Sequence, residues 1–131
     1  MSIAAEQLMG TWKLVEASAL DADGGLLSPP YGPEPMGRLV LTGAGRMMAV
    51  LCDGRTEMPA GQKRAYASYC GNFRIEDDRL ITTVDAALIA DRIGGEQIRR
   101  FILDGERLTL MPPRRADGAQ RFLVWERESA G

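Results

Sequence analysis

The sequence contains no histidine among its 131 residues. This absence excludes Ser-His-Asp and Cys-His nucleophilic catalysis, imidazole general bases, and the commonest protein ligand of transition metals. Any chemistry must therefore use carboxylates, tyrosine, lysine, arginine or cysteine. We expect no metal and no cofactor. In particular, Gly43-Ala44-Gly45 lacks the third glycine and the following helix of a nucleotide-binding loop.

Cysteine is scarce, and neither sign of charge dominates. Cys52 and Cys70 are too few for a disulfide scaffold and lack the spacing of a zinc or redox motif. We expect two reduced thiols, although both lie near the ends of one long connection and could meet in space. The 16 basic and 18 acidic residues are dispersed and give a formal net charge of −2. This balance argues against nucleic acid as a partner.

Long apolar runs are also missing. No stretch approaches the roughly 20 apolar residues that span a bilayer, and residues 1–6 carry no basic segment of a secretory signal. We therefore expect a cytoplasmic protein with no membrane partner. A length of 131 residues is usual for one domain, so residues 1–131 are expected to share a single core.

Short strand-like segments bounded by glycine, proline or aspartate make up most of the chain. The expected strands are residues 10–20, 37–41, 46–52, 69–75, 79–86, 97–103, 107–111 and 120–126. Several connections are short enough for hairpins, so consecutive strands should pair as an up-and-down meander. A meander of about eight antiparallel strands removes its unpaired edges by closing. The sequence therefore predicts an all-β closed barrel.

Three longer connections, at residues 21–36, 53–68 and 87–96, fall at one end of such a barrel. The first contains four prolines and cannot form regular structure. Short helical turns are expected at residues 62–67 and 87–93. This end should be the mouth, because loops on a rigid scaffold commonly carry binding sites.

Several motifs together resemble a known family. They are Gly10-Thr11-Trp12-Lys13-Leu14-Val15, Gly45-Arg46-Met47, Tyr69-Cys70-Gly71-Asn72-Phe73, residues 96–110 and Leu123-Val124-Trp125-Glu126-Arg127. The series resembles the bacterial and fungal lipocalin-like domain family from near residue 8 to residue 127. The resemblance implies a calycin barrel, as in lipocalins and fatty-acid-binding proteins, that binds a small molecule. The chain departs from the family at Thr82 and Thr83, where a histidine is expected in relatives.

Side chains of a half-buried strand alternate between two faces, and this parity selects the residues expected inside the barrel. Tyr69, Gln97, Arg99 and Arg121 should converge near the mouth. The apolar residues expected to contact the ligand or form the floor are Met47, Phe73, Phe101, Trp12 and Trp125. Trp12 and Trp125 are also expected to pack with Arg127 and close the far end. Such a pocket suits an amphipathic molecule with an acidic or carbonyl end.

Arg99 is the most specific candidate for holding the polar end of the ligand. It shares a strand face with Phe101 and Leu103, so burial of those two residues would draw its guanidinium inward. Two structural alternatives remain: an ion pair with Glu16 or Asp85, or a solvent-facing Arg99 with Arg100 pointing inward. Arg121 could likewise be solvated at its strand end.

Two functions of different classes follow from these residues. The first is binding of a small, largely apolar or amphipathic molecule. The alternative is a cofactor-independent enzyme that isomerises, dehydrates or cyclises a polyketide- or terpenoid-like metabolite, with Tyr69 as acid and Glu16 as base. Separately, an outward apolar set of Met48, Val50 and Cys52 indicates either a homodimer or a loop folded over that strand.

Overall fold

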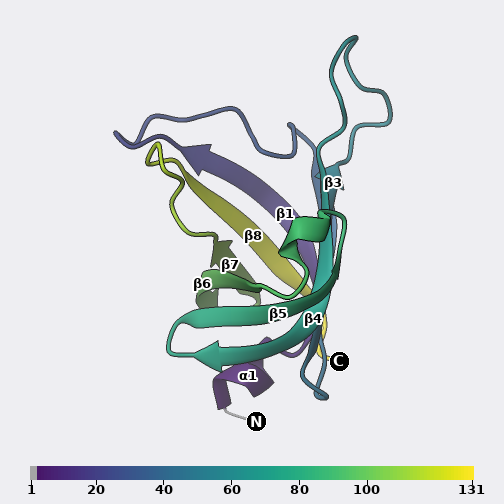
Figure 1. Cartoon of the computed structure of the whole chain (residues 1–131), viewed down its shortest axis with the longest axis vertical. Helices are drawn as coiled ribbons and strands as arrows, with labels where there is room; N and C mark the ends of the chain where they lie inside the picture. Colours follow the sequence, from purple (N-terminus) through teal and green to yellow (C-terminus); the bar gives the residue numbers. More distant parts are fainter. Residues whose placement is uncertain (1–2) are drawn as a thin grey trace.

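The computed structural model describes residues 3–131, and its eight antiparallel strands close into one barrel in sequence order (Figure 1). The strands are β1 Gly10–Leu20, β2 Pro35–Leu41, β3 Arg46–Asp53, β4 Tyr66–Glu76, β5 Arg79–Ala87, β6 Glu96–Asp104, β7 Arg107–Met111 and β8 Gln120–Ser129. The barrel closes because β8 also pairs with β1. The predicted lipocalin-like, up-and-down barrel is confirmed, and all eight expected strands are present.

The helix α1 (Ile3–Leu8), which was not expected, lies at the end opposite the long connections (Figure 1). The Trp12 indole N–H donates to the Leu8 carbonyl oxygen at 2.9 Å. Arg127 donates to the carbonyl oxygens of Met9 and Gln7, both at 2.6 Å. Its guanidinium lies 4.2 Å from the centroid of the Trp12 ring. These contacts hold α1 and the residues after it against the closed end of the barrel.

A β-bulge in β1 changes which of its residues face inward. The register against β8 shifts between Leu14 and Glu16, so side-chain parity reverses at that point. Leu14 and Ala17 are buried, whereas Glu16 is exposed. The expectation that Glu16 faces the interior is therefore wrong, because the additional residue of the bulge turns it to the outer face.

The long connections lie together at the mouth, with residues 54–65 extending furthest from the barrel (Figure 1). The turn expected near residues 87–93 is present as the 3₁₀ helix η1 (Ala90–Arg92). The helix expected at residues 62–67 is absent, because Tyr66 and Ala67 instead pair with β3 at the start of β4. No helix within residues 3–131 is long and apolar enough to cross a membrane.

A buried ion pair at the end of β3 lies against the proline-rich connection. Asp53 has a side chain only 3% exposed, and it accepts a hydrogen bond from Arg55 at 2.6 Å. Arg64 donates to the Asp53 carbonyl oxygen at 2.6 Å. Gly32, with a φ of +72°, packs so closely on the Asp53 carboxylate that a Cβ would overlap it. The pair therefore fixes the proline-rich connection, including Tyr31, beside the end of β3.

The outer face of β3 is less apolar than expected. Met48 and Val50 are exposed, but Cys52 is buried and does not extend that surface. Cys52 and Cys70 are both free, in agreement with the expected reduced thiols. A homodimer through Met48 and Val50 stays a prediction.

Candidate ligand-binding cavity

A cavity of about 210 Å³ lies inside the barrel towards its mouth. Alternate inward-facing residues of five strands supply its apolar wall, namely Leu39, Met47, Ala49, Leu51, Ala67, Leu110, Leu123 and Trp125. Its polar wall is made by Tyr31, Tyr69, Arg92, Arg99, Arg115 and Arg121. The volume is below the roughly 300–1,000 Å³ of pockets for drug-sized ligands, so the cavity suits a compact molecule.

The structure brings together most of the polar residues selected by strand parity. Tyr69, Arg99 and Arg121 line the cavity, and so does Met47. Gln97 does not line it, but its side-chain oxygen accepts a hydrogen bond from Arg99 at 2.9 Å. The inward residues of β4, β6 and β8 near the mouth therefore converge as the alternation of these strands predicted.

The expected floor of the cavity needs correction. Phe73 and Phe101 are half-buried and pack against the core cluster, but neither lines the cavity. Both come later in strands that run from the mouth to the closed end, so they fill the barrel beneath the cavity. Trp12 lies deeper still, against α1. Of the four expected floor residues, Trp125 alone lines the cavity, and the ring on which Arg127 stacks is that of Trp12.

Arg99 faces the cavity without a charged partner. Its guanidinium donates to two neutral acceptors, the Gln97 side-chain oxygen at 2.9 Å and the Ile98 carbonyl oxygen at 3.0 Å. The expected alternatives are wrong: Glu16 is on the outer face, and Asp85 is bound elsewhere. Arg100 was the alternative arginine expected to point inward in place of Arg99, but it is exposed and pairs with Asp78.

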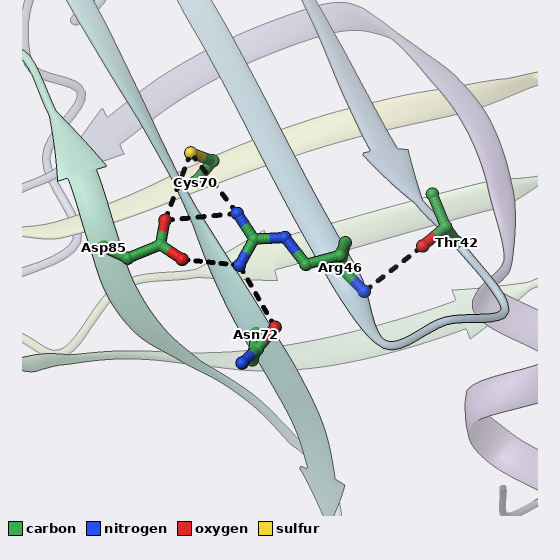
Figure 2. Close-up of polar contacts among 5 residues, drawn as sticks. All are labelled: Thr42, Arg46, Cys70, Asn72 and Asp85. Carbon is green, nitrogen blue, oxygen red and sulfur yellow. Dashed lines mark hydrogen bonds and ion pairs between the residues drawn. The ribbon is translucent and has the colours of Figure 1, made fainter.

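Asp85 belongs to a separate network on the outer face of β3, β4 and β5 (Figure 2). Both of its oxygens accept hydrogen bonds from Arg46, at 2.5 and 3.1 Å. The Cys70 thiol donates to the same carboxylate at 3.5 Å, and Arg46 also donates to Asn72 at 3.1 Å. The adjacent guanidinium lowers the pKa of Asp85 from its usual value. Asp85 therefore remains ionised and engaged outside the barrel.

The cavity is strongly positive because its arginines have no acidic neighbours. Four arginines line it, and no aspartate or glutamate does. Within residues 3–131, none of these four guanidinium groups lies within 4.0 Å of a carboxylate. Arg92, Arg99 and Arg121 are partly buried, whereas Arg115 is exposed. A partly buried charge without a partner is costly, so the first three arginines favour an anionic group in the cavity.

Tyr31 is a lining residue that the sequence reasoning missed, as are Arg92 and Arg115. All three come from connections, where no strand periodicity indicates which way a side chain points. Burial raises the pKa of Tyr31, and the positive charges of Arg121, Arg92 and Arg99 offset part of that effect. The Tyr31 hydroxyl is consequently protonated at neutral pH and is available as a hydrogen-bond donor.

Trp125 carries a buried donor without a partner in the described part of the chain. The residue is 1% exposed, and its indole N–H has no hydrogen-bond acceptor within residues 3–131. Buried donors without an acceptor are rare in native proteins. Among the described residues, no group of three or more His, Cys, Asp or Glu side chains is placed to hold a metal ion.

The match to a protein-family model agrees with the barrel. Residues 9–128 match the family described as "Lipocalin-like domain". A crystal structure of an uncharacterized protein from Bacteroides eggerthii DSM 20697 is 13% identical, with a TM-score of 0.47; the match covers 90% of this chain and 98% of that chain. No curated protein is significantly similar in sequence. The lipocalin-like fold suggests small-molecule binding in a cavity. Because the family match spans nearly the whole sequence, this chain belongs to the lipocalin-like domain family.

Proposed function

We propose that the barrel binds one small amphipathic molecule in its cavity, with the polar end towards the mouth. The observation that carries this proposal is the division of the cavity wall. Tyr69 lies nearer the mouth than Met47 in the β3–β4 ladder. Arg99 and Arg121 lie nearer the mouth than Leu110 in the ladders of β7. Apolar burial would supply affinity, at roughly 25 cal/mol per Å² of surface removed from water. The polar residues would set the orientation of the ligand.

In this proposal Arg99 anchors the polar end. Its guanidinium is held by Gln97 and the Ile98 carbonyl oxygen, so its direction is already set before a ligand binds. A hydrogen bond to a charged group contributes about 1.5 to 3 kcal/mol, which corresponds to about a 10- to 150-fold change in affinity. Since no carboxylate is paired with Arg99, removing its charge should leave the barrel as stable as before.

Isothermal titration calorimetry with 1-naphthalenesulfonate, a compact aromatic anion, tests the proposal. The native protein should bind one molecule, and Arg99→Met should weaken binding 10- to 150-fold without lowering the melting temperature. Arg100→Met is the matched control, because that neighbouring arginine is exposed and lies outside the cavity. Its binding should equal that of the native protein.

A variant that fills the cavity tests the location. Ala67 lines the mouth side and is only half-buried, so Ala67→Phe should occupy the cavity and abolish binding. Retained binding by Ala67→Phe, or no binding of naphthalene probes by the native protein, would contradict the proposal. Native mass spectrometry of protein from its own host should also detect a small bound molecule, which Ala67→Phe should lack.

The catalytic alternative loses the residue pair on which it was based. It required Glu16 as a base near Tyr69, but Glu16 is exposed on the outer face and no carboxylate lines the cavity. Binding is therefore the function that the geometry supports best.

A further inference from the structure

We infer that the ligand carries a dianionic head group, with two negative charges held close together, as in a phosphate monoester or two adjacent carboxylates. This inference rests on the proposed function and specifies the chemical class of its ligand. Three observations support it. They are the hydrogen-bond donors of the cavity wall, the positions of two partly buried arginines, Arg99 and Arg121, and the contrast with arginines elsewhere on the barrel.

The polar wall offers many hydrogen-bond donors and few acceptors. Arginine has five N–H donors and no acceptor, and four arginines line the cavity. The protonated hydroxyl of Tyr31 adds a further donor. Ionised carboxylate and phosphate groups are rich in acceptors, so they complement this wall best.

Two of the arginines come from strands that flank the short strand β7. The last β7 residue that pairs with β6 is Met111, and the last that pairs with β8 is Leu110. Arg99 on β6 and Arg121 on β8 therefore lie nearer the mouth than the last β7 pairs. Both line the cavity, together with Pro112 and Pro113, which follow β7.

These arginines act on one common region. The charges of Arg121, Arg92 and Arg99 all affect the hydroxyl of Tyr31, which itself lines the cavity. Arg99 and Arg121 are partly buried, so solvent screens their mutual repulsion less than it would on the surface. A monoanion would neutralise the charge of only one of these two arginines. A dianion would neutralise both, and would therefore gain more from the same site.

Most arginines outside the cavity are paired with a carboxylate, whereas Arg64 and Arg114 donate to backbone carbonyl oxygens. On the outer wall Arg46 pairs with Asp85, as Figure 2 shows, and Arg38 pairs with Glu128. The sequence has slightly more acidic than basic residues, 18 against 16, so acidic partners are not scarce. All four arginines that line the cavity lack a carboxylate partner within residues 3–131, which leaves them available to a ligand.

A series of three probes with the same rings tests the head-group charge: 1-naphthol, 1-naphthalenesulfonate and 1-naphthyl phosphate. Calorimetry at pH 8 presents these as neutral, singly charged and doubly charged molecules, because a phosphate monoester has its second pKa near about 6. We expect affinity to rise about tenfold or more at each step, since each added charge strengthens hydrogen bonds to guanidinium groups. Arg121→Met should reduce phosphate affinity to about that of the sulfonate and leave naphthol unaffected.

The pH dependence of the native protein provides a measurement that needs no variant. Because the chain lacks histidine, no side chain with an ordinary pKa changes charge between about pH 5 and pH 7.5. The affinity for 1-naphthyl phosphate should rise over that range as the phosphate loses its second proton. The affinity for 1-naphthalenesulfonate should stay constant, and Arg100→Met should behave as the native protein in both titrations.

The outcomes separate the two proposals. Equal affinities for the sulfonate and the phosphate, or a flat pH profile for the phosphate, would overturn the dianion inference. Naphthol binding as tightly as both anions would also overturn it, while leaving a cavity that binds small molecules. Failure of all three probes to bind would instead overturn the proposed function.

Discussion

Removal of the Trp12 side chain tests how the closed end of the barrel is held. Trp12 is fully buried, its indole N–H donates to the Leu8 carbonyl oxygen, and Arg127 stacks on its ring. The substitution Trp12→Ala would therefore remove a large apolar surface, one hydrogen bond and one cation–π contact at once. It would also leave the Leu8 carbonyl oxygen without its donor.

The expected loss can be worked from these contacts. A buried tryptophan removes roughly 200 Å² from water, which at about 25 cal/mol per Å² corresponds to about 5 kcal/mol. The hydrogen bond and the cation–π contact add about 1 kcal/mol each. Residual burial in the unfolded chain and partial collapse of α1 into the space reduce the total. We therefore expect the free energy of unfolding to fall by about 3 to 5 kcal/mol.

Urea unfolding followed by far-ultraviolet circular dichroism measures this loss. For a slope of about 1.5 kcal/mol per molar urea, the midpoint should fall by about 2 to 3 M. Trp12→Phe is the control, because it keeps an aromatic ring beside Arg127 and loses only the N–H and part of the surface. Its midpoint should fall by about 1 M or less.

A shift below about 1 kcal/mol for Trp12→Ala would refute the reasoning. It would mean that α1 and Arg127 do not depend on Trp12. If Trp12→Ala is already unfolded without urea, the comparison of Trp12→Phe with the native protein still gives the sign and scale of the effect.

Two further predictions concern the backbone and pH. Gly71→Ala should lower the free energy of unfolding by about 1 to 3 kcal/mol, because its Cβ would overlap the Thr83 carbonyl oxygen; Gly43→Ala, which meets only the Met9 sulfur at 3.4 Å, should change the melting temperature little. The hydrogen bond and charge of Arg55 lower the pKa of Asp53 from 3.8 to about 2. The folded state therefore binds fewer protons at this site, so the contribution of Asp53 is complete above about pH 4 and is lost as pH falls towards 2. In melting curves from pH 5 to 2, Asp53→Asn should start less stable than the native protein and lose less on acidification; parallel curves would contradict this.

Much of the barrel could be predicted because its information is local. Strand positions follow from alternating side chains and from turn residues within each segment, so β3, β6 and β8 were recognised without knowledge of their neighbours. The inward direction of Arg99 and Arg121 follows from the same period of two, since each shares a face with apolar residues two positions along. The polar mouth of the cavity could therefore be assigned in part from the sequence.

Other features depend on contacts between distant segments, which local patterns do not encode. The bulge that turns Glu16 outward exists only in the pairing of β1 with β8. Tyr31 reaches the cavity because its connection packs on the Asp53–Arg55 pair, and nothing in a proline-rich segment indicates that direction.

The sequence by itself determined the number and order of the strands, and the facing of those without a bulge, because these depend on neighbouring residues along the chain. The tertiary structure decided which side chains fill the barrel and which leave space: Phe101 packs into the core, whereas Arg99, two residues earlier, lines the cavity. It also decided that Asp85 pairs with Arg46 outside and leaves Arg99 without a carboxylate. Charge pairing depends on distance in space, and the closure of the barrel sets that distance.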